Sequence, residues 1–454
     1  MPTWMSADAP KDAPETGAPG LFEARIDQLG LEGDGVCRAD PAPIHVRYAL
    51  AGETVLAEPI GRNRARTVSV LAASPDRVEP PCSLFGRCGG CVLQHQDIAA
   101  SLDWKRGVVE AALRSAGFSI PHIVATAQSA PRTRRRMDLA VRRLPDGLTL
   151  GLHARGSERV IDLTTCDILD PTLFALLTKA RPVLARLQGL RKSGSLLVNL
   201  LDSGPDLLLA TDGALVARDR AILAEFATGA AIPRIAWQPE DGSAVPEIAS
   251  LLSPVSHRFA GSPATLTVQP PPGAFLQATA TGEDAIVQAV LRGLPDRLSR
   301  STRLIELYAG CGTLSFALSG RARVAAYEGN ALAVEALRVA GSTQRIEAIA
   351  RDLNRQPLLA RDFSGVAAIV LDPPHAGAGA QMREIARSLV PRVIYVSCNP
   401  AALATDAALL AREGYSLAQL TVIDQFLWSA RAESVAVFSK PPTVRRGPLP
   451  RPNR

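Results

Sequence analysis

The sequence lacks any long hydrophobic run, and no segment approaches the roughly 18–20 apolar residues that a membrane-spanning helix needs. Its amino-terminal stretch, MPTWMSADAPKDAPETGAPG, lacks the basic region and apolar core of a signal peptide. It also lacks internal repeats, and cysteine is scarce, with 7 residues in 454. We therefore expect a cytoplasmic protein without a membrane partner. In a reducing compartment, grouped cysteines bind metal or act in catalysis before they form disulfides.

The composition is that of a soluble globular protein with room for two or three domains. Hydrophobic residues make up 47% of the chain, charged residues make up 21%, and the formal net charge is +6. This mildly basic balance permits a nucleic-acid partner without requiring one. Residues 1–20 are rich in Pro, Ala, Gly and acidic residues, which predicts a disordered lead. Residues 441–454 are expected to form a loose basic tail.

The first two sections of the chain differ in character. From 21 to 76, short alternating apolar runs are separated by glycines, which is typical of a small antiparallel β-barrel. From 77 to 263 the pattern is mixed α+β. Here DIAASLDWKRGVVEAALRSAGF has helical spacing, and SLLVNLLDSGPDLLLAT predicts a hairpin with a Ser-Gly-Pro-Asp turn.

The third section, residues 264–440, has an α/β pattern. Its strand-like runs are RLIELYAG, RVAAYEGN, VAAIVLDPP, RVIYVSCNP and SVAVFSK, and helical stretches lie between them. Alternating apolar strands and helices predict a largely parallel sheet covered on both faces. Ligands bind such sheets at the carboxyl ends of the strands. Four of the runs end in chemically capable residues, so we expect the site there.

Two of these strand ends indicate a nucleotide-like cofactor. Gly310 and Gly312 in ELYAGCGTL allow a sharp turn close to a ligand, and Glu328 ends the next run, where a carboxylate can accept hydrogen bonds from ribose hydroxyls. A nicotinamide cofactor fits this spacing, but the third glycine of the dinucleotide fingerprint is missing. S-adenosylmethionine, which has a ribose and no phosphate, fits better. A plain turn with a surface glutamate is the alternative reading.

The two other strand ends carry a carboxylate and a thiol. Asp372 is followed by two prolines, which predict a stiff loop with a carboxylate at its base. Cys398 follows RVIYVS directly and precedes Asn-Pro. Free cysteines are among the most often buried residues, so Cys398 taken alone favours a small core residue over a nucleophile. Its position beside the other strand-end groups favours the nucleophile.

Three cysteines lie within CSLFGRCGGC, at Cys82, Cys88 and Cys91. Glycines between ligands let a loop wrap a metal centre, and the lone Cys166 is a candidate fourth ligand. Four thiolates hold either tetrahedral zinc or an iron–sulfur cluster. Structural zinc more often shows two close cysteine pairs, so three clustered cysteines and a remote one favour a [4Fe–4S] cluster with a structural or RNA-positioning role. Separately, PRTRRRMDLAVRR offers a phosphate-binding face, with Arg132, Arg134, Arg135, Arg136, Arg142 and Arg143.

Together these motifs resemble the TRAM-domain, iron–sulfur RNA uracil-5-methyltransferases, from about Leu21 to Lys440. The resemblance implies an OB-like TRAM barrel that binds RNA, a [4Fe–4S] site on the four cysteines, and a class I, Rossmann-like methyltransferase domain using S-adenosylmethionine. It further implies ribosomal RNA, most specifically 23S rRNA, as the substrate. One substrate per chain makes a monomer the expected state. By the same resemblance Cys398 is the nucleophile and Glu433, in DQFLWSARAESV, is the general base. The cofactor contacts that it implies are Gln277, Tyr308, Gly310, Thr313, Glu328 and Asp372.

The chain departs from the family pattern around the substrate. His375 stands where family members have Arg, and Thr279 where they have Asn. Further departures are Leu427, Arg431, Ala402 and Thr405. These changes keep the thiol and the carboxylate but leave the target uridine open. Three alternatives to 23S rRNA methylation follow: methylation of a tRNA uridine, amino methylation through the Asp-Pro-Pro loop, and a catalytically silent RNA-binding factor.

Overall fold

The structure is a computed structural model that describes residues 20–145, 147–388 and 390–440. The expected lead at 1–20, apart from Gly20, and the expected tail at 441–454 lie outside the described residues. The chain divides into two units. The first unit comprises Met1–Val108, Thr126–Ala285 and Ile423–Glu433, and the second comprises Val109–Ala125, Ile286–Val422 and Ser434–Arg454.

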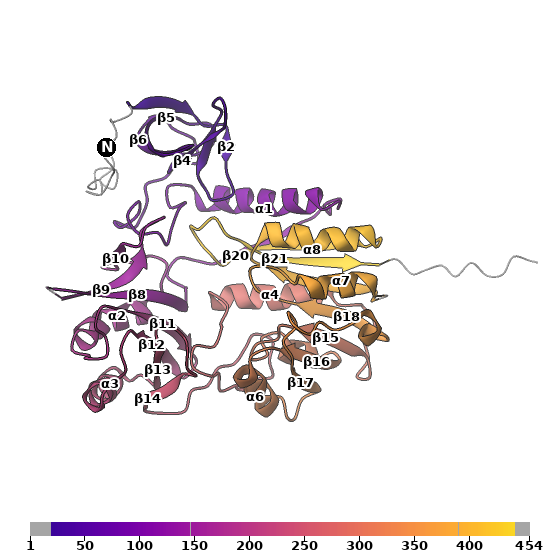
Figure 1. Ribbon diagram of the computed structural model, residues 1–454. Helices are drawn as coiled ribbons and strands as arrows, with labels where there is room; N and C mark the ends of the chain where they lie inside the picture. Colours follow the sequence, from indigo (N-terminus) through magenta and orange to yellow (C-terminus); the bar gives the residue numbers. More distant parts are fainter. Residues whose placement is uncertain (1–19, 146, 389, 441–454) are drawn as a thin grey trace, which may run out of the picture. The chain divides into compact units, whose positions relative to one another are not determined.

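The first unit begins with a six-stranded sheet of order β1-β5-β6-β4-β3-β2, in which all but the β4–β6 pairing is antiparallel. It has its own hydrophobic core, centred on Ile26, Val46 and Val55. The section from 21 to 76 therefore forms the expected small β structure (Figure 1). Its strands are β1 (Phe22–Arg25), β2 (Gln28–Leu29), β3 (Gly35–Cys37), β4 (Ile44–Arg47), β5 (Thr54–Gly61) and β6 (Arg64–Ala72).

A second sheet of the first unit has seven strands in the order β10-β9-β8-β11-β12-β13-β14. One large core under this sheet extends from Cys82 to Ile235 and includes helices α2 and α3. The elements of this part are β8 (Arg136–Leu144), β9 (Gly147–His153), β10 (Val160–Asp162), α2 (Pro171–Leu184), β11 (Ser193–Leu201), β12 (Gly204–Thr211), α3 (Ala217–Ala230), β13 (Arg234–Pro239) and β14 (Glu247–Leu251).

The hairpin expected in this sheet forms, but its predicted turn is wrong. β11 ends at Leu201 and β12 begins at Gly204, so the connecting residues are Asp202 and Ser203. Gly204 takes a φ of +119°, and Pro205 already pairs with Leu200 inside the ladder. A proline near the start of a strand is tolerated because its missing N–H costs little there. The Gly-Pro pair thus starts the strand instead of making the turn.

The third sheet has the order β17-β16-β15-β18-β19-β21-β20-β7, and its strands β15 to β19 pair in parallel. The α/β class is therefore confirmed, with β21 antiparallel to β19. Helices α5 and α6 pack on β16 and β17, and α8 packs on β19. The elements are β15 (Arg303–Leu307), α5 (Ser315–Ser319), β16 (Arg323–Glu328), α6 (Ala331–Ala340), β17 (Ile346–Ala350), η2 (Ala360–Phe363), β18 (Val366–Leu371), α7 (Ala380–Arg387), β19 (Arg392–Ser397), α8 (Pro400–Arg412), β20 (Ser416–Asp424) and β21 (Glu433–Ser439).

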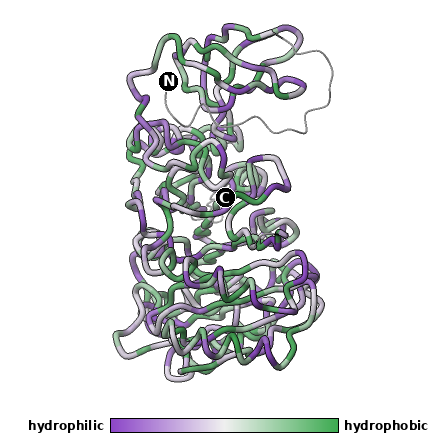
Figure 2. Tube along the Cα trace, turned by 90° about the vertical axis from the view of Figure 1, so that its left-hand side faces the viewer, coloured by the Kyte–Doolittle hydropathy of each residue, from purple (hydrophilic) through white to green (hydrophobic). Residues whose placement is uncertain are grey.

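The remaining elements are α1 (Ile98–Ser115), β7 (Ala125–Gln128), which is the last strand in the order of the third sheet, and α4 (Ala280–Gly293). Helix α1 covers the predicted helical segment and ends just before Gly117, which takes a φ of +96°. Along the described trace, hydrophobic and hydrophilic stretches alternate over short distances (Figure 2). No helix in the described residues is long and apolar enough to cross a membrane.

Candidate active site

The expected cofactor loop follows β15, whose residues Leu304 to Leu307 are buried. Gly310 and Gly312 take φ angles of +55° and +101°, which only glycine adopts readily, so the chain turns sharply before α5. The carboxylate of Glu328, at the end of β16, accepts the Gly310 N–H at 2.9 Å. Its other oxygen accepts the Asn330 N–H at 2.7 Å. The hydrogen bond from Gly310 to Glu328 therefore links the loop after β15 to the end of β16.

Three more predicted cofactor contacts border this loop. Tyr308 takes a φ of +63°, its hydroxyl is buried without a hydrogen-bond partner among the described residues, and burial raises its pKa to about 12. Thr313 is half-buried directly after Gly312. Asp372 follows β18, and its N–H donates to the Leu307 carbonyl at 3.4 Å. The carboxyl ends of β15, β16 and β18 thus gather the predicted groups at one edge of the parallel sheet.

A buried carboxyl that sequence reasoning missed lies beneath this edge. Glu306, on β15, is 2% exposed and accepts a hydrogen bond from the Ser315 hydroxyl. Burial raises its pKa to about 8, Ser315 opposes that shift, and the charges of Asp372 and Glu328 add to it. Glu306 therefore keeps its proton at neutral pH, which avoids a third negative charge beside the loop.

The elevated pKa of Glu306 predicts a pH-dependent stability. The folded chain binds the Glu306 proton up to about pH 8, whereas the unfolded chain releases it near the ordinary value of 4.5. The stabilisation is therefore complete below pH 4.5 and is lost as pH rises through 8. In the wild type, the free energy of unfolding should therefore fall by about 1.4 kcal/mol per pH unit in this window because of Glu306. We expect the Glu306→Gln variant to lack this contribution to the slope. Urea unfolding of both proteins from pH 5 to 8 measures this slope.

The control for that measurement is Glu347→Gln, because Glu347 is an exposed carboxylate on β17. It should keep the wild-type slope. Parallel stability curves for Glu306→Gln and the wild type would contradict the assignment.

Cys398 lies between β19 and α8 and is half-buried. Asn399 caps α8, since its side-chain oxygen accepts the N–H groups of Ala401 at 3.1 Å and Ala402 at 3.4 Å. The Asn399 amide also donates to the His375 carbonyl at 2.8 Å. The thiol therefore sits at the amino end of a 13-residue helix, where backbone N–H groups carry partial positive charge. The same cap joins the thiol loop to the Asp-Pro-Pro-His loop.

The Asp-Pro-Pro-His loop is further held by Asp406 on α8. One Asp406 oxygen accepts the Tyr395 hydroxyl at 2.6 Å and the Ala378 N–H at 2.7 Å. A Cβ at Gly377 would lie 2.8 Å from that carboxylate, so glycine is needed for the close approach. Strand β19, the thiol loop and the residues after Asp372 are thus tied to a single helix.

The predicted general base begins the strand next to β19. Strands β19 and β21 pair antiparallel, and the last pair of the register is Ser397 with Ser434. Cys398 follows Ser397 in the chain, and Glu433 precedes Ser434. The residues that carry the thiol and the carboxylate therefore lie at the same end of two neighbouring strands. Glu433 is buried, at 4% exposed.

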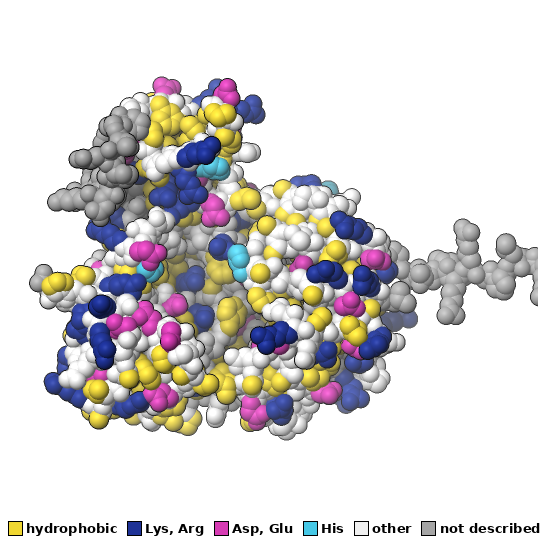
Figure 3. Space-filling model, in the orientation of Figure 1, with side chains coloured by type: hydrophobic (Ala, Val, Ile, Leu, Met, Phe, Trp, Pro, Cys, Tyr) yellow, Lys and Arg dark blue, Asp and Glu magenta, His cyan; other side chains and the backbone are white. Residues whose placement is uncertain are grey.

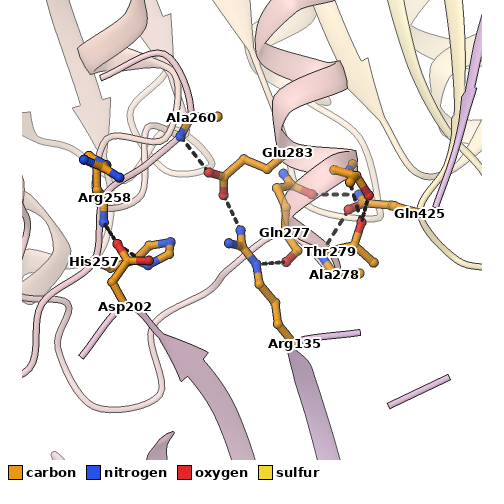
Figure 4. A network of polar contacts seen from close by, with 12 residues as sticks. Arg135, Asp202, His257, Arg258, Ala260, Gln277, Ala278, Thr279, Glu283 and Gln425 are labelled. Carbon is orange, nitrogen blue, oxygen red and sulfur yellow. Dashed lines mark hydrogen bonds and ion pairs between the residues drawn. The ribbon is translucent and has the colours of Figure 1, made fainter. Parts of the chain in front are cut away.

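Gln277 lies in a buried polar network of the first unit (Figure 4). Its backbone carbonyl accepts the Arg135 Nε–H at 3.1 Å, and Arg135 also pairs with Glu283. The side-chain oxygen of Gln277 accepts a hydrogen bond from Gln425 at 2.7 Å. Sequence reasoning missed Gln425 and Glu283, because their partners lie about 150 residues away in the chain and no local motif marks them.

The expectation of a six-arginine phosphate-binding face is wrong for at least two of its members. Arg135 is 8% exposed and is hydrogen-bonded within the network around Gln277. Arg143 donates to the backbone carbonyls of Ala185, Leu187 and Leu190, each at 2.8 Å. Figure 3 shows basic side chains dispersed among acidic ones on the face in view. The arginines of this run therefore lie partly in the interior of the first unit and partly at its surface.

Cys82, Cys88, Cys91 and Cys166 line one cavity of about 300 Å³ in the first unit. Arg134 lines it too, and the Leu169 N–H donates to the Cys166 sulfur at 3.4 Å. Burial raises the pKa of the Cys82, Cys88 and Cys91 thiols. Within the described residues, no three His, Cys, Asp or Glu side chains are arranged so that they could hold a metal ion. The fold thus brings the remote Cys166 to the three clustered cysteines around a shared space.

Comparisons with known proteins agree with this architecture. Residues 268–440 match the model of the tRNA (Uracil-5-)-methyltransferase family. An RNA methyltransferase of Mesorhizobium japonicum is 38% identical over 426 residues, which cover 93% of this chain and 98% of that protein. The 23S rRNA (uracil(1939)-C(5))-methyltransferase RlmD of Halomonas elongata is 34% identical over 95% of this chain and 92% of its own length.

The fold is also similar to that of a solved structure. The tRNA (uracil-54, C5)-methyltransferase of Pyrococcus abyssi, in complex with S-adenosyl-L-homocysteine, superposes with a TM-score of 0.67. The match covers 92% of this chain and 100% of that one, at 18% sequence identity. At that identity the likeness concerns the fold, and it extends over both units.

Proposed function

Because the chain belongs to the RNA uracil-5-methyltransferase family, we propose that it methylates C5 of a uridine in 23S ribosomal RNA with S-adenosylmethionine as methyl donor. The observation that carries the proposal is the position of Cys398 and Glu433 at the same end of β19 and β21. A soft nucleophile and a carboxylate are the two groups that C5 methylation requires of the protein. The name of the Halomonas elongata relative favours ribosomal over transfer RNA.

The roles of the two residues follow from the chemistry of uracil. C5 is a poor nucleophile, so the Cys398 thiolate adds to C6 and converts the ring into an enolate whose C5 attacks an electrophilic methyl group. Glu433 then accepts the proton from C5, the C6–S bond breaks, and the aromatic ring returns with the thiolate released. S-adenosylmethionine, when bound, would supply the methyl group from its sulfonium sulfur, whose bond to the methyl carbon breaks and leaves neutral S-adenosylhomocysteine. The proton and the thiolate are thereby both accounted for.

The strand-end groups of the second unit fit a ribose-containing donor. The backbone at Gly310 leaves open space where a Cβ would stand, so a ligand can approach it closely. Glu328 offers a carboxylate suited to two ribose hydroxyls, and Tyr308 offers a buried hydroxyl that lacks a partner among the described residues. By family resemblance, we also propose Gln277, Thr313 and Asp372 as cofactor contacts.

For the four cysteines we propose a [4Fe–4S] cluster with a structural role. Four thiols line one cavity, which matches the number of protein ligands that such a cluster takes, and no iron would be left open for substrate. The six-stranded sheet of residues 22–72 is proposed as a TRAM-like RNA-binding barrel.

The cluster proposal predicts that protein purified without oxygen is brown and contains about four irons per chain. Cys88→Ser should lose the colour and most of the iron, since one ligand of four is removed. Iron analysis and the visible spectrum measure both. The control is Cys37→Ser, because Cys37 lies in the core of the six-stranded sheet, away from the cavity. A colourless protein holding a single zinc ion would contradict the proposal.

The target is tested by mapping 5-methyluridine in RNA from strains with and without the gene. We expect one position in 23S rRNA to lose the modification and purified protein to restore it on a 23S transcript. A loss confined to transfer RNA would move the substrate to that class. N-methylated nucleosides without 5-methyluridine, or RNA binding without methyl incorporation, would overturn the proposed reaction.

A further inference from the structure

Gln425 occupies a junction between two residues with proposed roles. It follows β20 directly and is 2% exposed. Its Nε2 donates to the side-chain oxygen of Gln277 at 2.7 Å and to a carboxylate oxygen of Glu433 at 2.9 Å. Its own side-chain oxygen accepts the Ala278 N–H at 3.0 Å, as Figure 4 shows. The buried amide of Gln425 therefore contacts Gln277, which is a proposed cofactor residue, the backbone of Ala278, and Glu433, which is the proposed proton acceptor.

The direction of these hydrogen bonds is fixed by chemistry. The Ala278 backbone N–H can only donate, so the oxygen of the Gln425 amide must face it. Both Nε2 protons then point to the other two partners, which must accept. Gln277 accepts through its side-chain oxygen, so that oxygen must face Gln425. Gln425 thus sets which way the Gln277 amide is turned and supplies an N–H to Glu433.

The backbone around Gln425 is held on both sides by one cation. Lys105 donates from Nζ to the Asp424 carboxylate at 2.6 Å and to the Phe426 carbonyl at 3.1 Å. The side chains of Lys105 and Asp424 are fully buried, and Gln128 donates to the second Asp424 oxygen at 3.1 Å. A Cβ at Gly282 would lie 2.6 Å from the Gln425 Cβ, so α4 also packs closely against this residue. Gln425 is therefore rigidly placed, as a positioning group must be.

We propose that Gln425 is a positioning residue that couples the cofactor contact Gln277 to the proton acceptor Glu433. The inference rests on the proposed function, because it takes the roles of those two residues from there. Proton removal from C5 requires an ionised, correctly aimed carboxylate, and an N–H donated to that carboxylate favours both its charge and its orientation. The same amide fixes the orientation of the Gln277 side chain, because it donates to the Gln277 oxygen at 2.7 Å. Gln425 itself touches neither substrate nor cofactor in this scheme.

The test is Gln425→Leu, which keeps much of the volume and removes the amide. We expect S-adenosylhomocysteine, measured by isothermal titration calorimetry, to bind roughly tenfold more weakly, and kcat on a 23S transcript to fall roughly tenfold, as suits the loss of one buried hydrogen bond to each partner. Because proton removal follows methyl transfer, a denaturant-stable enzyme–RNA adduct should accumulate. A residue with a purely structural role would lower the amount of folded enzyme without changing this partition.

Gln419→Leu is the matched control, since Gln419 is exposed on β20, the strand that Gln425 follows. It should keep wild-type affinity, kcat and adduct level. Should Gln425→Leu not fold, Gln425→Met gives an unbranched side chain without a donor and carries the same expectation. If a folded variant releases the adduct at the wild-type rate and binds S-adenosylhomocysteine with wild-type affinity, the proposed coupling is wrong. Failure of the wild-type enzyme to form 5-methyluridine would instead overturn the proposed function.

Discussion

Cys398→Ala is expected to abolish formation of 5-methyluridine and of any covalent enzyme–RNA adduct. Without the thiolate, no group in the scheme adds to C6, and C5 keeps its low nucleophilicity. Removal of a covalent nucleophile elsewhere has cost of the order of 10⁶-fold in kcat, so activity should fall below detection. Transfer of tritium from labelled S-adenosylmethionine to a 23S transcript measures the reaction, and denaturing gels detect the adduct.

The fold should survive this substitution. Cys398 is half-buried, and Asn399 and Ser397 make hydrogen bonds within and from its loop that the substitution keeps. Binding of S-adenosylhomocysteine and of RNA should therefore stay near the wild-type level. Cys37→Ala is the control, because Cys37 is a buried core cysteine of the six-stranded sheet and has no proposed role in catalysis. Methyl incorporation by Cys398→Ala at a rate comparable to the wild type would show that the reaction proceeds without this thiol.

The strand-end residues could be predicted from the sequence for a simple physical reason. A buried parallel strand is a continuous apolar run, and the first polar residue after it lies at the edge where ligands bind. Glu328, Asp372 and Cys398 were expected at such ends, and the structure places them at the ends of β16, β18 and β19. Their chemical roles are not tested by these positions and stay predictions. The direction of a strand could not be predicted from the same pattern, because β21 is as apolar as its neighbours and yet runs antiparallel to β19.

The network around Gln277 could not have been predicted from local pattern. Its hydrogen bonds join Arg135 to Glu283 and Gln277 to Gln425 across about 150 residues of chain, and each partner alone resembles an ordinary polar residue. The arginine run misled for a related reason. Successive residues of an extended strand point to opposite faces, so a row of arginines is divided between surface and interior. Charge in the sequence marks a residue that needs a partner, and only the fold identifies whether that partner is solvent, RNA or protein.

Glu433→Gln should stall the enzyme after methyl transfer. The thiolate can still add to C6 and C5 can still accept the methyl group, but no carboxylate remains to take the C5 proton. The C6–S bond then breaks slowly, and turnover should fall by about 10²- to 10⁴-fold, the contribution of a positioned general base. Each enzyme molecule is expected to retain one methylated RNA, seen as a gel-shifted band whose mass includes the added methyl group. The variant should fold, since the glutamine oxygen can still accept the Gln425 N–H.

The order of events makes this variant more informative than a loss of activity alone. Cys398→Ala fails before the adduct, and Glu433→Gln fails after it, so the double variant should behave like Cys398→Ala and show no adduct. Glu413→Gln provides the control, because Glu413 is an exposed carboxylate just after α8. If Glu433→Gln released 5-methyluridine product at the wild-type rate, another group would have to accept the C5 proton. The hydrogen bond from Gln425 to Glu433 would then hold the end of β21 in place without a part in proton transfer.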